Sequence, residues 1–373
     1  MLRQGRTLIL NVLLLFLIGL MPPQPNAHQT ETYPDHSAVV ETIMAAHQDG
    51  SATTGQGGWV FRIKHDSGIL PEAAREALPR AHGGFAIDTR DGRGEVYFAL
   101  PGAGIIRLNA ALSSATLLPT APAMKAANLH NCTFWVDNRG RARLVFPANN
   151  AGKVFTTDLE GNLLHTLDAP TAETRFDAPW VEAYFGEGGR FAPTDVAYLN
   201  PLYYVTTGYS PLDAILTAQV KSPPLAAQWH DLAFSRKGEQ AGQLQTGHGI
   251  TVAPDGTRLD VADRPVAQIE RFTRFGHYRS TINLPEGAFP CDIAYLDDLA
   301  VVPCLHGKNR EAGAPIYLLQ DGKVISTIRP KADLGLETFQ HIHNAVIKRH
   351  KGRLLIAVQS WNPGDFVVLE QVQ

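Results

Sequence analysis

Three histidines have the type and spacing to do chemistry together: His130, His248 and His343. They are separated by 118 and 95 residues, and each begins a short apolar segment. Three imidazoles that meet at one point are a ligand set for a metal ion that keeps an open position for water or substrate. The alternative is that the three side chains form hydrogen bonds in a water-filled channel. The arrangement of the elements that carry the histidines distinguishes a metal site from a water-filled channel.

Those elements are six repeats of β-rich sequence. Each repeat has an apolar run, a turn and a second apolar run, and the repeats start at His82, His130, Asp195, His248, Asp292 and His343. The steps between these positions are 48, 65, 53, 44 and 51 residues. Four strands and their turns need about 40 to 50 residues, the period of a propeller blade. We therefore predict an all-β protein, a six-bladed β-propeller over residues 80–373, with an insertion in the longest step around residues 210–231.

The first residues of the strands in a propeller meet at its central channel. Side chains at the same position of each repeat should therefore lie close together. The three histidines start blades two, four and six, which are about 120° apart in a six-fold ring, and should point at one place on the axis. Asp195 and Asp292 start blades three and five, where they could accept hydrogen bonds from the imidazoles or from channel amides. His82 and His341 are candidates for an extra ligand or an acid–base group.

Composition describes a folded and exported protein. The chain is 44% hydrophobic and 18% charged, with a net charge of −3, so disorder and nucleic-acid binding are disfavoured. Arg3 and Arg6 precede an apolar run over residues 8–20, typical of a signal peptide and too short for a membrane span. We expect a signal peptide over 1–27, an N-terminal extension over 28–79 whose residues 59–64 could close the last blade, and a periplasmic or secreted monomer.

Two cysteines fit an oxidising compartment. Cys291 and Cys304 flank an apparent hairpin with Asp297 and Asp298 at its tip. A two-residue turn would place the two cysteines opposite one another, and we predict a cross-strand disulfide.

Several segments carry a resemblance to a known family. They are Ala192-Pro-Thr-Asp-Val-Ala, Thr207-Gly-Tyr, Gly247-His-Gly-Ile-Thr-Val-Ala-Pro, Val261-Ala-Asp-Arg and Ile342-His-Asn-Ala-Val. In this order they resemble the lyase domain of peptidylglycine α-amidating enzymes, NHL-type six-bladed propellers with three zinc-binding histidines. The resemblance covers residues 80–373, and its most specific part is the Ala-Asp-Arg segment.

The resemblance implies roles for further residues. It implies zinc at His130, His248 and His343, although copper and iron also take imidazole ligands. Tyr209 resembles the family's active-site tyrosine and Arg264 an arginine near the site, with Arg80 as a loose match to the catalytic arginine. Asn344 stands where the family has an aspartate of a structural calcium site, so calcium is in doubt here.

Together these features predict a zinc-dependent lyase. Zinc would polarise the hydroxyl of a carbinolamide, and loss of the amide would leave an aldehyde-acid such as glyoxylate. Tyr209 would act as a base or electrostatic helper while the arginines held a carboxylate. We expect a small or peptide-like substrate. The alternative is a propeller without turnover, either a periplasmic metal carrier or an interaction scaffold.

Overall fold

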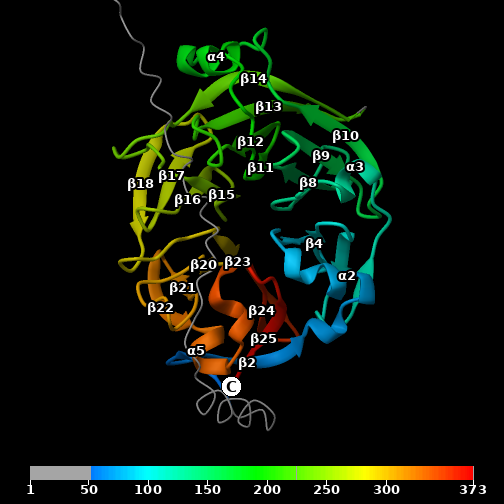
Figure 1. Ribbon diagram of the computed structural model, residues 1–373, viewed down its shortest axis with the longest axis vertical. Coiled ribbons are helices and arrows are strands. Elements are labelled where there is room, and N and C mark those ends of the chain that lie inside the picture. The colour runs from blue at the N-terminus through cyan, green and yellow to red at the C-terminus, as the bar shows by residue number, and fades with distance from the viewer. Residues whose placement is uncertain (1–51, 224, 373) are drawn as a thin grey trace, which may run out of the picture. The chain divides into compact units, whose positions relative to one another are not determined.

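The computed structural model describes residues 52–372 except residue 224. The predicted signal peptide and the first half of the extension, residues 28–51, lie outside the described residues. The described chain forms six antiparallel sheets arranged around a central axis (Figure 1). This arrangement confirms the predicted six-bladed β-propeller.

Each of the first three sheets is a meander of four consecutive strands. Sheet one contains β3 (Ala86–Ile87), β4 (Val96–Leu100), β5 (Gly104–Leu108) and β6 (Ala115–Leu117). Sheet two contains β7 (Thr133–Val136), β8 (Ala142–Ala148), β9 (Lys153–Thr157) and β10 (Leu163–Asp168). Sheet three contains β11 (Asp195–Leu199), β12 (Leu202–Thr206), β13 (Ile215–Lys221) and β14 (Ala226–Phe234).

The next two sheets repeat this order, and the last one differs. Sheet four contains β15 (Gly247–Val252), β16 (Arg258–Asp263), β17 (Gln268–Thr273) and β18 (Tyr278–Asn283). Sheet five contains β19 (Ala294–Leu296), β20 (Leu299–Pro303), β21 (Ile316–Gln320) and β22 (Lys323–Ile328). Sheet six joins β23 (Ile342–His350), β24 (Arg353–Ser360) and β25 (Phe366–Gln371) to β1 (Thr54–Gln56) and β2 (Trp59–Asp66) from the other end of the chain.

The sequence forms strands here because apolar, β-branched runs alternate with tight polar turns. Val252 pairs with Leu259 across the turn between β15 and β16. Gly256 in that turn has φ +67°, in the left-handed region that glycine adopts without strain. A turn of this kind fixes the strand register, and the register fixes which side chains face the axis.

The ring is closed by strands from the two ends of the described chain. β2, drawn in blue, runs antiparallel to β25, drawn in red (Figure 1), with Phe61 opposite Gln371 and Ile63 opposite Leu369. Phe61 is completely buried and packs in the hydrophobic cluster between sheets five and six. Residues 59–64 therefore occupy the place in the last blade that the sequence suggested for them.

The predicted insertion at residues 210–231 was wrong. Most of those residues belong to β13 and β14, which pair from end to end with one bulge at Asp231 and Leu232. Pro211 and Pro223 lie just before β13 and in the turn after it, and they leave the pairing of β13 with β14 in place. The extra residues of the long step lie instead between β10 and β11, where α4 (Pro179–Gly186) packs its Val181 and Phe185 against sheet three.

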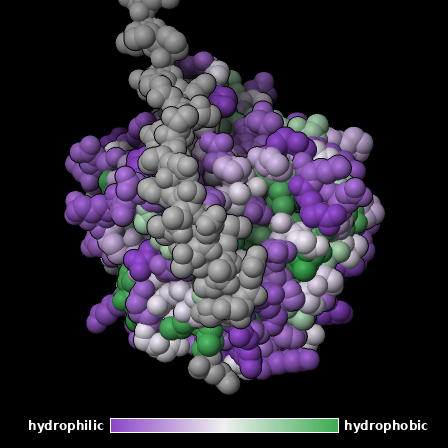
Figure 2. Space-filling model, turned by 60° about the horizontal axis from the view of Figure 1, so that its bottom comes forward, coloured by the Kyte–Doolittle hydropathy of each residue, from purple (hydrophilic) through white to green (hydrophobic). Residues whose placement is uncertain are grey.

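The remaining helices are short and connect the sheets. They are α2 (Glu72–Ala77), α3 (Pro122–Lys125) and α5 (Pro330–Leu334), with the 3-10 turns η1 (Ser67–Ile69), η2 (Leu78–Arg80) and η3 (Glu337–Gln340). Within the described residues, no helix has the length and apolar character needed to cross a membrane. The face in Figure 2 is mostly hydrophilic, with small scattered hydrophobic patches.

Truncating the side chain that closes the ring should destabilise the protein. Phe61→Ala leaves a cavity between sheets five and six, and we expect it to lower the free energy of unfolding by about 3–5 kcal/mol. Arg62→Ala in the same strand is the control, because its partly exposed ion pair with Glu370 contributes about 0–1 kcal/mol. Denaturant titration measures both, and equal effects of the two changes would contradict the packing role of β2.

Candidate metal centre

The three predicted histidines converge, and the neighbouring blade holds each ring in place. Each Nδ1 lies within hydrogen-bond distance of a backbone carbonyl at the start of the next blade: His130 with Thr194 (2.7 Å), His248 with Cys291 (2.6 Å) and His343 with Gly83 (2.8 Å). A carbonyl oxygen only accepts, so each Nδ1 carries the proton and donates it. The three Nε2 atoms are therefore left with lone pairs, the form in which imidazole binds metals.

Two of these lone pairs face one another. Nε2 of His130 lies 3.2 Å from Nε2 of His343, and neither atom has a proton to share. The contact is repulsive unless a cation lies between the rings. Two nitrogen ligands of a tetrahedral zinc ion, bonded at 2.0–2.1 Å, are about 3.3–3.4 Å apart, so the spacing fits a shared metal ion.

Protonation does not relieve this repulsion, because the rings are buried. Burial, opposed by the hydrogen bond to Thr194 and aided by the Arg264 charge, lowers the pKa of His130 to about 3. Burial also lowers the pKa of His248 and of His343 well below the usual value, with additional lowering by the Arg264 charge. All three imidazoles are neutral at pH 7.

His82 adds a fourth imidazole. One ligand atom from each of His82, His130 and His343 lies within 4.8 Å of the other two, a group that could hold a metal ion. The His82 ring is 4.6 Å from that of His130 and 4.5 Å from that of His343, centroid to centroid. Asn128 contacts its Nδ1 at 2.8 Å, and the Trp361 ring lies 5.4 Å from it.

His248 and His341 have different relations to this group. The His248 ring lies 4.7 Å from that of His130 and 5.1 Å from that of His343, while its Nε2 contacts the Tyr209 hydroxyl at 3.0 Å. The group that could hold a metal ion within the described residues is His82, His130 and His343, and His248 lies beside that group, next to the tyrosine. His341, the other candidate extra ligand, lies further out, with its ring 5.8 Å from that of Trp361.

Tyr209 and Arg264 lie beside the imidazoles. The Tyr209 hydroxyl is 3.2 Å from Nε2 of His130 as well as 3.0 Å from Nε2 of His248, so it donates to one of these lone pairs. Arg264 donates from Nη1 to the same hydroxyl at 2.9 Å. Burial raises the pKa of Tyr209, and the Arg264 charge opposes this rise.

Arg264 is a buried cation without a carboxylate partner among the residues that the structure describes. It is 5% exposed, and its other terminal nitrogen, Nη2, contacts the Cys291 sulfur at 3.1 Å. Its Nε has no hydrogen-bond partner within the described chain. An uncompensated buried guanidinium attracts an anionic group, so the cluster is suited to a ligand with a carboxylate.

Asp195 and Asp292 do not contact the imidazole N–H groups, because backbone carbonyls accept those bonds. Asp195 accepts from the backbone N–H groups of Val196 and Ile250, and Asp292 from that of Ile293. Burial raises the pKa of both carboxyls, Asp195 most strongly. The sequence left two alternatives for Asp195 and Asp292, and the geometry matches the one in which these carboxylates bind channel amides.

The side chains around Asp292 show whether the calcium ion that the resemblance implies could bind here. The Asn344 amide group donates to Asp292 Oδ2 at 2.8 Å, and Asn131 Nδ2 lies 3.3 Å from that oxygen. A Cβ on Gly84 would lie 1.6 Å from Asn131 Oδ1, so the amides fill the space. Calcium requires oxygen ligands, and with N–H groups turned to Asp292 these side chains do not fit it.

The predicted disulfide between Cys291 and Cys304 was wrong. All three cysteines of the chain are free and buried. The hairpin has the expected register at its tip, with Leu296 opposite Leu299. The register then shifts by one residue, so that Cys304 lies opposite Pro290. Cys291 instead contacts Arg264.

The structure does not bring Arg80 to the imidazoles. Arg80 is exposed at the end of η2, and its guanidinium lies near Gly102. Arg190, which the sequence analysis did not select, donates from Nη2 to the Tyr209 backbone carbonyl at 2.5 Å. It lies in the long connection before β11, where no repeat position gives a signal for function. Cys291 and Trp361 were missed as neighbours of the cluster for a similar reason.

Comparisons with known proteins bear on the fold. No protein-family model matches the chain, and no curated protein sequence matches it. A gluconolactonase from Xanthomonas campestris, described as important in glucose secondary metabolic pathways, is 15% identical over 86% of this chain and 98% of its own, with a TM-score of 0.50. At this identity the likeness shows the propeller fold alone, and the resemblance to amidating lyases stays a prediction.

Two further solved structures are similar to the chain. Virginiamycin B lyase from Staphylococcus aureus is 14% identical over 78% of this chain and 96% of its own, with a TM-score of 0.45. Hydrazine synthase from Kuenenia stuttgartiensis is 11% identical over 61% of this chain, with a TM-score of 0.41. This chain spans about half, 55%, of the hydrazine synthase chain.

The buried imidazoles should make the metal-free protein sensitive to acid. His130 has a pKa of about 3 when folded and about 6.5 when unfolded, so the unfolded state binds more protons between these values. Stability therefore falls as pH drops from 6.5 towards 3, by about 1.4 kcal/mol per pH unit for each such imidazole. Denaturant titration of chelator-treated protein at several pH values measures this slope.

His130→Gln is the comparison for that slope. Asp195 and Asp292, whose pKa values are raised, contribute a slope of opposite sign in both proteins, so the difference reports His130. We expect a shallower acid dependence in the variant. Identical slopes would mean that the His130 imidazole is not held neutral by burial.

Proposed function

We propose that this protein is an exported, metal-dependent lyase that cleaves the C–N bond of a small or peptide-like carbinolamide carrying a carboxylate. The observation that carries the proposal is the pair of buried Nε2 lone pairs of His130 and His343 at 3.2 Å, which calls for a cation. The resemblance to amidating lyases supports the reaction, and imidazole ligands support zinc as the metal.

The residues that would hold the ion are the imidazoles of the cluster. His130, His248 and His343 have Nε2 lone pairs set by their bonds to backbone carbonyls, and His82 lies within reach of the same point. When bound, zinc supplies a Lewis acid that polarises a hydroxyl group and lowers its pKa.

The protein's own groups supply the proton transfer. Arg264 donates to the Tyr209 hydroxyl and so stabilises its deprotonated form, in which Tyr209 can act as a base. Tyr209 takes the proton from the substrate hydroxyl as the carbon–nitrogen bond breaks, and it passes this proton to the departing amide nitrogen. The products are a primary amide and an aldehyde-acid such as glyoxylate.

Arg264 also gives the reaction its substrate preference. Its positive charge has no carboxylate partner among the described residues, and burial strengthens its attraction for an anion. A substrate carboxylate would form charge-assisted hydrogen bonds with it. We propose a monomeric, periplasmic or secreted protein, as the N-terminal sequence suggests, with no nucleic-acid partner.

Metal content is the first test of this function. Mature protein purified without added metal should contain about one zinc ion per chain, while His248→Ala and His130→Ala should lose it, because each change removes one imidazole of the cluster. His277→Ala, an exposed histidine on the turn before β18, is the matched control and should keep the metal. No metal in the parent protein, even after zinc is supplied, would overturn the proposal.

Replacing the tyrosine hydroxyl separates catalysis from binding. We expect Tyr209→Phe to keep its metal and to release glyoxylate from α-hydroxyglycine amides at least 100-fold more slowly than the parent protein, because the base is lost. Enzymatic detection of glyoxylate measures the rate. Equal rates would eliminate Tyr209 as the base. A metal-loaded parent protein without turnover on any such amide would favour the metal-carrier alternative.

A further inference from the structure

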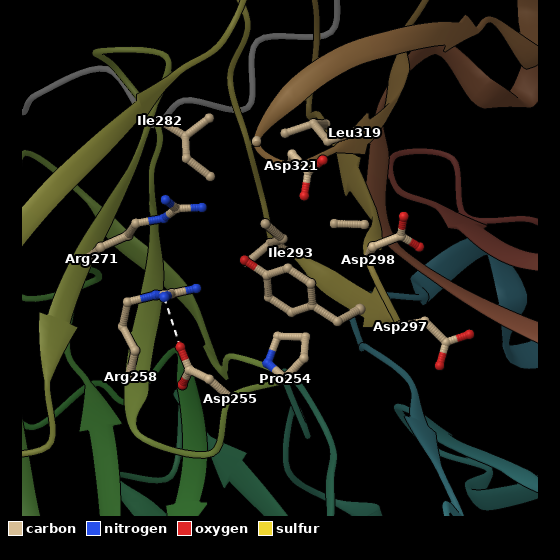
Figure 3. Close-up of a pocket in the computed structure, with 13 residues that line it drawn as sticks. Pro254, Asp255, Arg258, Arg271, Ile282, Ile293, Asp297, Asp298, Leu319 and Asp321 are labelled. Carbon is tan, nitrogen blue, oxygen red and sulfur yellow. Dashed lines mark hydrogen bonds and ion pairs between the residues drawn. The ribbon is translucent and has the colours of Figure 1, made fainter.

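Two cavities lie between neighbouring blades, at the ends of the strands away from the histidines. The larger, about 370 Å³, lies between sheets four and five (Figure 3). The smaller, about 330 Å³, lies between sheets one and two. Turns between the first and second strands and between the third and fourth strands of a blade form the rims of both.

The arginines that line the larger cavity form ion pairs with carboxylates of the protein. Arg258 pairs with Asp255 at 2.8 Å, the dashed contact in Figure 3, and with the buried Asp260 at 2.9 Å. Arg271 lies 3.8 Å from Asp260, and the Tyr295 hydroxyl donates to that same carboxylate. The cations of this cavity are therefore already neutralised by protein carboxylates.

The smaller cavity differs at the equivalent position. Arg271 faces Asp260 across β17 and β16, whereas Arg107 faces Tyr97 across β5 and β4. A phenol thus replaces the carboxylate, and Arg107 forms no ion pair with any residue in the described part of the chain. Its guanidinium is hydrogen-bonded to the Tyr97 phenol, and a guanidinium has further N–H donors that a ligand can use.

Two buried polar atoms of residues that line this cavity have no hydrogen-bond partner among the described residues, against one, Nε of Arg271, in the larger cavity. One is a donor, Nε of Arg143, a residue that is 9% exposed. The other is an acceptor, Oε2 of Glu95. Both residues line the cavity. Buried polar atoms are normally hydrogen-bonded, so this pair points to a ligand that both donates and accepts.

We propose that the smaller cavity binds a neutral, polyhydroxylated molecule, a sugar. Four arginines and four carboxylate residues line it, so its formal charge is zero and gives no advantage to an ion. Few apolar side chains line it, which disfavours an apolar ligand. A hydroxyl group donates and accepts at once, as the unpartnered atoms of Arg143 and Glu95 require. The volume is sufficient for a small ligand.

Calorimetric titration with D-glucose, D-mannose and N-acetylglucosamine tests the proposal, with glycine and sulfate as a zwitterionic and an anionic probe. We expect saturable binding of at least one sugar, weakened at least 10-fold by Arg107→Gln and by Glu95→Gln. Arg271→Gln, at the equivalent position of the larger cavity, is the matched control and should bind as the parent does. His130→Ala should also bind sugar normally, since the cavity is separate from the histidines.

Other results would overturn the proposal. These are binding of no sugar, preference for glycine or sulfate, and equal binding by the parent protein and Arg107→Gln. Thermal unfolding checks that each variant is folded. Should Arg107→Gln fail to fold, Tyr97→Phe removes only the hydroxyl beside Arg107, and we expect it to weaken sugar binding at least 3-fold. An unchanged affinity in Tyr97→Phe would then count against the site.

Discussion

The hydrogen bonds from three imidazoles to the backbone of the following blade are the interaction on which the site depends. Because a carbonyl can only accept, these bonds fix the proton on Nδ1 and turn each Nε2 lone pair toward the other rings. They also join blade two to three, four to five and six to one. The same contacts that position the ligand atoms therefore connect neighbouring blades around the ring.

Most of the correct predictions from the sequence were based on the position of a residue within its repeat. The fold was predictable because apolar runs and turns recur with the period of a blade, and the convergence of His130, His248 and His343 followed from their equal places in alternate blades. The tyrosine and Arg264 came from a resemblance, since nothing in their spacing marks them. Both lie at the cluster in the structure, whereas Arg80, matched in a region without a motif, lies at the surface.

The remaining features depend on details that no pattern in one sequence encodes. A one-residue shift of register separates Cys291 from Cys304, and such irregularities follow from packing rather than from the hydrophobic pattern. The acceptors of the imidazole protons are backbone atoms, which have no residue type to recognise. The long connection before β11 was misplaced because the 65-residue step shows that this repeat has extra residues but not where along the repeat they lie.

The closure of the sixth sheet has a consequence for how the protein is made. β2 is synthesised long before β25, its partner, so the two strands wait for one another across about 300 residues of chain. Until β25 emerges, the edges of β2 and β24 that it joins are unpaired, and unpaired edges are prone to join other chains. His343 also emerges late, so the metal ligands cannot assemble on a partial chain. Ring closure and assembly of the cluster therefore both wait for the segment from His343 to β25.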